Sequence, residues 1–176
     1  MKITIKHILI LLVLVQVSFA QTNSFNQNSK WLNIGIGIDP NTVHLNISAN
    51  YSYPNRLILV QYKNGNSIST YSPIQPGTYV KGFGLTEYQS LGAAYGVISK
   101  WKYAYSSIAL GPVFISSKGN RLHRNPEWSA LGAMVEAQLF LTPFAQFGIG
   151  CSIGHYHFSE TSFSSLSVGI QLGDLR

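Results

Sequence analysis

Charged residues are scarce in this chain, and they are missing from the interior of its apolar runs. Only 12 of the 176 residues are Lys or Arg, and six are Asp or Glu. Beyond residue 20, every one of them except Glu136 lies at the end of a run that alternates apolar with small or polar residues, or between two such runs. A strand with one face toward lipid and the other toward a lumen has this period of two, and about ten residues cross a bilayer when the strand is tilted.

Cysteine is nearly absent as well. Cys151 is the one cysteine of the chain, so no internal disulfide can form. Its neighbours Ile149 and Ile153 share its face, which favours a small hydrophobic residue over a reactive thiol. No cysteine lies near the start of the chain, and this argues against a lipid-anchored lipoprotein.

The first twenty residues have the layout of a secretory signal. Lys2 and Lys6 precede an apolar stretch, and Ser18 and Ala20 stand at the two positions that a signal peptidase reads before Gln21. A membrane anchor is the alternative, but the apolar stretch is short for a spanning helix. We therefore expect a cleavable signal peptide at 1–20 and an outer-membrane barrel domain at 21–176.

Removal of this segment lowers the formal charge from +6 to +4, because ten basic residues then face six acidic ones. Export excludes intracellular nucleic acid as a partner. Anionic lipid headgroups and anionic polysaccharides remain as partners for a basic surface outside the cytoplasm.

The alternating runs number eight and are joined by connectors of two kinds. They span residues 31–39, 43–51, 56–63, 88–97, 103–115, 130–141, 144–157 and 164–173. We expect tight turns around Pro54, around Lys100 and at Thr142 and Pro143, and long loops at 64–87 and 116–127. The sequence does not decide which side chains of 57–63 and 103–115 point outward. Pro112 is expected at a bulge or a strand end.

Short and long connectors on opposite ends are typical of a transmembrane barrel. The predicted fold is all-β, an eight-stranded antiparallel transmembrane β-barrel with up-and-down meander order.

Aromatic residues gather near the expected turns, as the two interfaces of a bilayer would select. One group is Trp31, Tyr51, Tyr53, Trp101, Tyr103, Phe140 and Phe144, and the other is Tyr62, Phe114, Trp128, Tyr156, Phe158 and Phe163. Strands of any kind favour aromatics, so this pattern alone leaves a soluble strand protein open.

The whole mature chain resembles the small outer-membrane β-barrels of Gram-negative bacteria, the OmpA-like and OmpX-like group. The closing run LSVGIQLG looks like a terminal barrel strand, although the chain ends in Asp174, Leu175 and Arg176 where such proteins commonly end in an aromatic residue. The resemblance implies a monomer of the cell outer membrane in contact with lipid and lipopolysaccharide. It implies a structural or surface-interaction role without an open pore, catalysis or cofactor. A soluble exported β-barrel or sandwich is a further alternative.

Glu136 is the one acidic residue inside a run, and its parity with Gly132 and Gln138 places it in the lumen. A lone buried carboxylate is costly, so we expect a basic partner, with His44 or Lys63 as candidates for a lumenal polar network. The interior of an eight-stranded barrel is just wide enough for side chains to fill, which favours a structural network over a pore.

A hydrolase site is the second functional hypothesis. A turn at Thr142 and Pro143 would set Ser129 opposite His157 and Glu127 opposite Ser159, gathering a nucleophile, a base and an orienting acid. The His-X-Ser pair resembles that of outer-membrane lipid A deacylases, but Gln171 stands where their acid is expected. A polar rim without catalysis is the other interpretation. His155 and His157 lack an evident third ligand, so no metal is expected.

The second long loop carries Lys118, Arg121, His123 and Arg124, which have the chemistry to bind lipopolysaccharide phosphates. A solvated loop is the alternative. An extracellular ligand at the loops 64–87 and 116–127 also fits the pattern.

Overall fold

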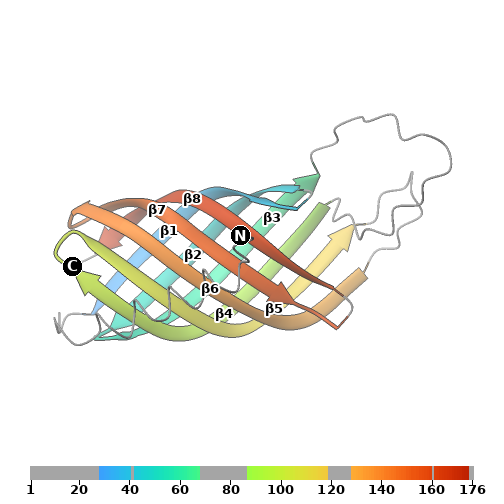
Figure 1. Cartoon of the computed structure of the whole chain (residues 1–176), viewed down its shortest axis with the longest axis horizontal. Helices are drawn as coiled ribbons and strands as arrows, with labels where there is room; N and C mark the ends of the chain where they lie inside the picture. Colours follow the sequence, from blue (N-terminus) through green and yellow to red (C-terminus); the bar gives the residue numbers. More distant parts are fainter. Residues whose placement is uncertain (1–27, 41, 68–86, 119–127, 160, 175–176) are drawn as a thin grey trace, which may run out of the picture.

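Eight antiparallel strands in simple meander order form a closed barrel (Figure 1). The computed structural model describes residues 28–40, 42–67, 87–118, 128–159 and 161–174. The strands are β1 Ser29–Asp39, β2 Thr42–Tyr53, β3 Arg56–Ser67, β4 Glu87–Trp101, β5 Ala104–Lys118, β6 Trp128–Phe144, β7 Phe147–His157 and β8 Ser162–Asp174. β8 pairs with β1 and closes the sheet, so no strand edge is left free among the described residues. The predicted fold class and the predicted number of strands are both confirmed.

The connectors also alternate as expected. The links after β2, β4 and β6 are two residues each, and they share one end of the barrel with the start of β1 and the end of β8. We call this the short-turn end. The opposite end carries the connectors 68–86 and 119–127 and is called the long-connector end. The expected signal peptide lies outside the described residues. None of the described residues belongs to a helix long and apolar enough to span a membrane.

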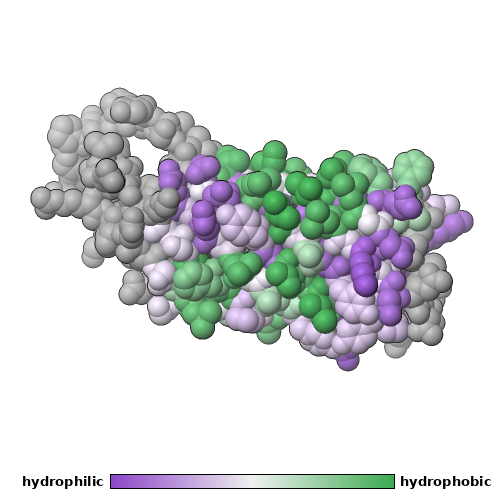
Figure 2. Space-filling view, turned by 180° about the vertical axis from the view of Figure 1, so that it is seen from behind, coloured by the Kyte–Doolittle hydropathy of each residue, from purple (hydrophilic) through white to green (hydrophobic). Residues whose placement is uncertain are grey.

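Alternation along each strand sends apolar side chains outward and polar or small ones inward. On β1 the outward residues Leu32, Ile34, Ile36 and Ile38 are exposed, whereas Asn33 is buried. Figure 2 shows the consequence on one face, an apolar band around the middle of the barrel with hydrophilic residues toward the ends. A band of this kind matches the apolar belt of a transmembrane barrel.

The two strands of open facing also alternate, but their inward side chains include large apolar ones. On β3, Leu57, Leu59, Gln61 and Lys63 point inward, and Ile58, Val60 and Tyr62 point outward. On β5 the inward residues are the odd-numbered ones from Tyr105 to Ser117, with Gly111 among them half-buried. Pro112 lies well inside β5, opposite Ala133 of β6 and without a register shift. The expectation of a bulge or strand end there is therefore wrong. Pro112 is exposed and lies at a point where the regular pairing with β4 is interrupted. The missing backbone N–H of the proline therefore costs few inter-strand hydrogen bonds.

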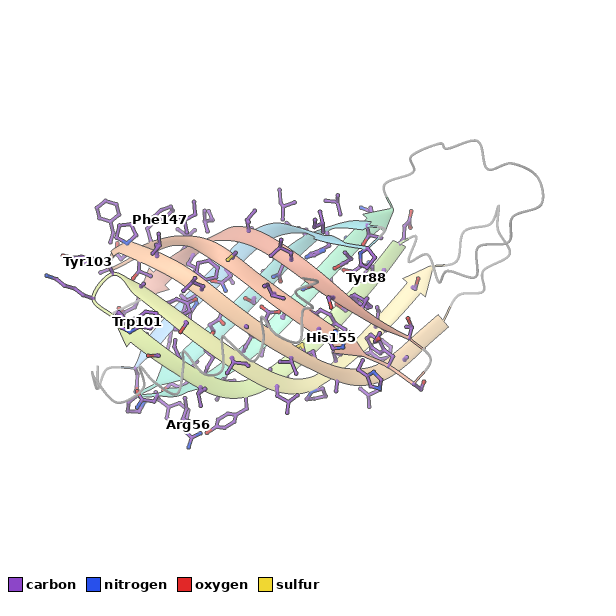
Figure 3. The ribbon with its side chains drawn as sticks, viewed as in Figure 1. Arg56, Tyr88, Trp101, Tyr103, Phe147 and His155 are labelled. Atoms are coloured by element: carbon purple, nitrogen blue, oxygen red, sulfur yellow. The ribbon has the colours of Figure 1, made fainter. Side chains whose placement is uncertain are left out.

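The expected pair of aromatic belts is correct only in part. Tyr62, Tyr103, Phe114 and Phe144 are exposed on the outside. Figure 3 shows Trp101, Tyr103 and Phe147 gathered at the short-turn end. Five other members of the two expected groups are buried in the lumen instead: Trp31, Phe140, Tyr156, Phe158 and Phe163. The interior of the barrel therefore has aromatic rings toward both ends. Between them it combines polar side chains with apolar ones such as Leu59, Val113 and Met134.

Candidate functional site

Glu136 lies at the centre of a buried polar network. Its Oε2 accepts a hydrogen bond from Nε2 of Gln61 at 2.5 Å, and its Oε1 accepts one from Nε2 of Gln138 at 3.0 Å. The Tyr156 hydroxyl donates to Oε1 of Gln61 at 3.0 Å and lies 3.4 Å from Oε2 of Glu136. The alternation of β6 places Glu136 in the lumen, as its parity predicted, where it is 1% exposed. Amide and hydroxyl donors thus hold the carboxylate.

Neither of the two basic residues expected as partners, Lys63 and His44, forms a direct ion pair with Glu136. Nζ of Lys63 donates to Oγ of Ser165 at 2.7 Å and lies 4.6 Å from the ring centroid of Tyr156. It belongs to the same buried layer and attracts Glu136 electrostatically, but it makes no direct ion pair with that carboxylate. His44 lies closer to the long-connector end, where its Nδ1 is 3.2 Å from Oδ2 of Asp39.

Asp39 and His44 form a second cluster, which has the order of a catalytic triad. Nε2 of His44 lies 2.9 Å from Oγ of Ser167, so an acid, an imidazole and a hydroxyl follow one another. Oδ2 of Asp39 also accepts hydrogen bonds from Oγ1 of Thr42, at 3.0 Å, and from the Tyr88 hydroxyl.

The space around this cluster argues against hydrolysis. The hollow beside Ser167 has a volume of about 10 Å³. Such a volume holds one water molecule at most and no acyl chain. We assign this cluster a structural role.

A third layer closes the lumen toward the short-turn end. The ring of Tyr105 lies between Trp31 and Phe140, with centroid distances of 5.2 and 5.7 Å. The Tyr105 hydroxyl accepts a hydrogen bond from Nε2 of Gln171. Still nearer the short-turn end, Nζ of Lys100 donates a hydrogen bond to Oγ of Ser29 at 2.7 Å.

The hydrogen bonds of these layers reach across the barrel. Gln61 of β3 bonds Tyr156 of β7, the strand diametrically opposite. The pairs Gln61–Glu136, Lys63–Ser165, Tyr88–Asp39, Lys100–Ser29 and Gln171–Tyr105 join strands three positions apart. Side chains thus bridge the lumen at three levels between the two ends.

The structure does not have the register on which the rim hydrolase hypothesis depended. β6 continues through Thr142 and Pro143 to Phe144, and the turn falls at 145–146. A bulge between Leu141 and Phe144 accommodates Pro143. His157 consequently lies opposite Ala133 instead of Ser129. Ser159 is exposed, and Glu127 lies outside the described residues, so the structure does not bring the three together.

The basic residues of the second long connector are placed only in part. Lys118 is the last residue of β5, and its backbone lies opposite Glu87 of β4. Arg121, His123 and Arg124 lie outside the described residues. Nδ1 of His155 lies 3.0 Å from Oγ of Ser164, and the described residues contain no cluster of three metal-ligating side chains.

Sequence reasoning missed several members of the lumenal layers. In the sequence Asp39 only ends an alternating run, and Gln61 lies in a strand whose facing the pattern does not decide. Gln61 is the one polar side chain between Arg56 and Lys63 that is neither charged nor aromatic. This isolation was the available signal for a buried amide.

Comparison with solved structures identifies the fold. The N-terminal β-barrel domain of Pseudomonas aeruginosa OprF is 14% identical, with a TM-score of 0.62, over 84% of this chain and 98% of that one. Ail, the attachment invasion locus protein of Yersinia pestis, in complex with the heparin analogue sucrose octasulfate, is 11% identical with a TM-score of 0.55 over 83% and 97%. Neisserial surface protein A is 12% identical with a TM-score of 0.54 over 82% and 96%.

The chain has the fold of the small outer-membrane barrels. No family model matches the sequence, and no curated protein matches it. The fold and the apolar exterior are those of a barrel of the outer membrane.

Proposed function

We propose that this chain is a closed, non-conducting barrel of the cell outer membrane with a structural or surface-interaction role. The observation that carries the proposal is the set of hydrogen bonds across the lumen. Because Gln61 reaches both Glu136 and Tyr156 from the other side of the barrel, these side chains occupy the space that water and ions would need. The interior of eight-stranded barrels is in general just wide enough for such filling.

The exterior supports membrane residence over a soluble barrel. Leu131, Ile36 and Val168 are 73%, 62% and 62% exposed on the outside of the sheet. Exposed apolar patches larger than a few hundred Å² are rare on soluble monomers, whereas acyl chains cover them in a bilayer. In this proposal residues 1–20 are removed on export, the short-turn end faces the periplasm, and the barrel is a monomer.

The first experiment separates a sealed membrane barrel from the alternatives. The mature protein is expected to sediment with outer membranes, to begin at Gln21 and to run faster in an unheated detergent gel than after boiling. Reconstituted in planar bilayers, it should show no conductance where a porin does. Recovery from the soluble periplasm, or stable single-channel steps, would contradict the proposal.

Binding of lipopolysaccharide phosphates is the finer form of the surface role. Lys118, Arg121 and Arg124 supply three cationic residues in the sequence where β5 ends and the connector 119–127 follows. The complex of Ail with a polysulfated sugar shows that a barrel of this fold can be solved with an anionic ligand. For an extracellular ligand we propose the loops expected at 64–87 and 116–127, of which 68–86 and 119–127 lie between strands.

The test is binding of purified lipopolysaccharide to the barrel in detergent. Replacing all three basic residues with glutamine should weaken binding by about 100-fold, at roughly 1 kcal/mol for each charge near an anionic surface. Replacing Lys30, Arg56 and Lys102 with glutamine removes the same number of charges at the short-turn end and is the matched control. Equal losses in the two variants would show that net charge, and not this loop, determines binding.

A further inference from the structure

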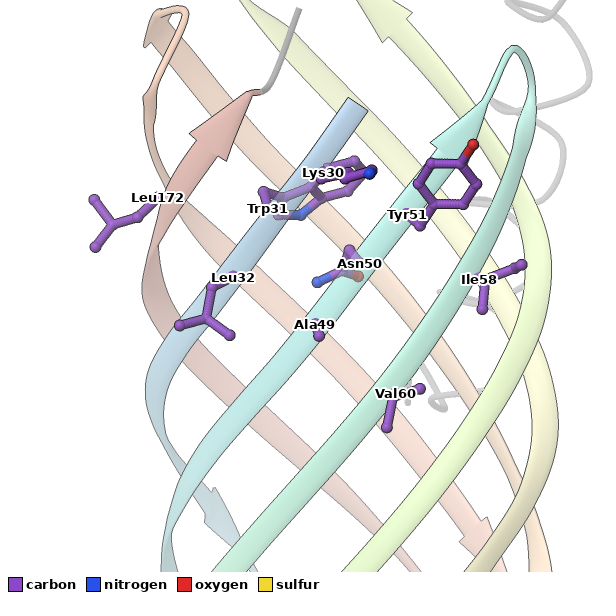
Figure 4. A pocket seen from close by; sticks show the side chains of 9 residues that line it. All are labelled: Lys30, Trp31, Leu32, Ala49, Asn50, Tyr51, Ile58, Val60 and Leu172. Carbon is purple, nitrogen blue, oxygen red and sulfur yellow. The ribbon is translucent and has the colours of Figure 1, made fainter. Parts of the chain in front are cut away.

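The outer surface of the barrel has a groove near the short-turn end. It has a volume of about 730 Å³, extends over β1, β2 and β3, and reaches Leu172 of β8 (Figure 4). Ala49 forms its floor, because its short side chain lies between Leu32 of β1 and Val60 of β3 at the same level of the sheet. Both flanking residues are large and exposed. The hollow is shallow and open to the outside, so it suits a chain that lies along the surface of the barrel rather than an enclosed small molecule.

A lysine and a tyrosine stand at the end of this groove nearer the short turns. Lys30 and Tyr51 are cross-strand partners, and Nζ of Lys30 lies 5.7 Å from the centroid of the Tyr51 ring. Asp174 of β8 flanks Lys30 on the other side in the register. The Lys30 side chain turns toward β2 and Tyr51, away from β8, so its ammonium group lies over the groove (Figure 4).

The spacing of these two levels fits a phospholipid. Lys30 and Tyr51 lie two residues from Leu32 and Ala49 along their strands, about 7 Å at roughly 3.4 Å per residue. A strand tilt of about 40° reduces this to roughly 5 Å of depth in the membrane. That is the separation expected between a lipid phosphate and the beginning of its acyl chains. Tyrosine and lysine are also the side chains that prefer the headgroup level.

We propose that this groove binds one anionic phospholipid of the periplasmic leaflet. Its phosphate lies at Lys30 and Tyr51, and one acyl chain lies over Ala49 between Leu32 and Val60. The inference rests on the membrane residence and orientation proposed above. Cations at other positions of the short-turn end, Arg56 beside Tyr95 and Lys102 beside Tyr103, attract anionic lipid in general. The hollow over Ala49 adds a place for the acyl chain.

Native mass spectrometry of the full mature barrel tests this site. The protein is released from nanodiscs containing equal amounts of phosphatidylglycerol and phosphatidylethanolamine, and the retained lipid is identified by mass. We expect one retained phosphatidylglycerol per barrel. Lys30→Gln should lower its retention about fivefold, the factor that one basic residue near an anionic surface supplies. Ala49→Leu places a larger side chain on the outer surface and fills the groove, so it should lower retention of both lipids.

Lys102→Gln is the matched control, because it removes a lysine over a tyrosine at the same end but outside the groove. Ala49→Val replaces Ala49→Leu if the larger side chain prevents folding, and the heat-dependent gel shift reports folding in every variant. Equal effects of Lys30→Gln and Lys102→Gln would overturn the site, as would unchanged retention in both Ala49 variants. Equal retention of the two lipids by the wild type, or a lipid-free dimer, would also overturn it. A barrel that does not enter nanodiscs would instead refute the proposed function.

Discussion

Lysine placed at successive outward positions of β8 measures how the barrel lies in its membrane. Leu166, Val168, Ile170 and Leu172 all face outward and are at least 38% exposed. Val168 is the central residue of this 13-residue strand, and Leu172 lies four residues nearer the short-turn end. The two positions share a facing and differ in depth.

The structure gives the expected magnitudes. Four residues at about 3.4 Å each, tilted by about 40°, place Leu172 roughly 10 Å from the level of Val168. Half of an apolar band about 25 Å tall is about 12 Å, so Leu172 lies close to the interface. Lysine should therefore cost about 2–4 kcal/mol at Val168 and about 0–1 kcal/mol at Leu172.

Urea unfolding in phospholipid vesicles, followed by tryptophan fluorescence and gel mobility, gives the free energy of unfolding of each variant. Val168→Met is the control for side-chain length without charge, and it should cost well under the lysine variant. A flat profile, with similar small losses at both positions, would show that water and not lipid surrounds β8. The transmembrane interpretation of the exterior would then be wrong.

Three further changes test the lumen and the rim. Glu136→Leu should destabilise the barrel by about 3 kcal/mol or more in the same urea assay, because it leaves buried amide donors unpaired, and Glu136→Gln should cost less than half of this. Equal stability of both variants and the wild type would disprove the network. Gly111→Ala should cost about 1–3 kcal/mol, because the added methyl group presses against the backbone of the neighbouring strand. Gly148→Ala should cost less, because its added methyl group would lie 3.1 Å from the nearest backbone atom, and the reverse order would contradict the packing. Overproduction of the wild type should leave the lipid A acyl chains unchanged by mass spectrometry, with Ser159→Ala and His157→Ala indistinguishable from it, whereas acyl loss in the wild type alone would revive the hydrolase hypothesis.

The strands were predictable because their period is simple and their charges are excluded. Asn33 alternates with Leu32 and Ile34, and the structure buries the first and exposes the other two. The connector lengths predicted that the tight turns lie together at one end of the barrel and the long connectors at the other. The turn between β6 and β7 was misplaced because a proline either ends a strand or lies in a bulge within it. The local sequence around Pro143 does not distinguish the two, and the bulge that accommodates it shifts the whole register of the rim.

The lumenal aromatics were misassigned although a signal was present. Trp31 has the parity of Asn33, and Tyr156 has the parity of Ser152, so the strand period alone places both rings inside. The two-belt interpretation used nearness to the turns and ignored parity. Contacts between strands far apart in the sequence, such as Gln61 with Tyr156, depend on barrel closure and strand register, which no local pattern specifies.

Large lumenal side chains and glycines lie opposite one another, and this arrangement explains how so narrow a barrel is filled. Gly65 is the cross-strand partner of Tyr88, and Gly150 is that of Phe140. A methyl group added at either glycine would meet the ring of its partner. The rings therefore lie in space that the glycines leave empty, as expected where small and large residues alternate inside small barrels. Because the glycines let the rings fill the lumen, the same residues that weaken each isolated strand complete the sealed interior on which the non-conducting role depends.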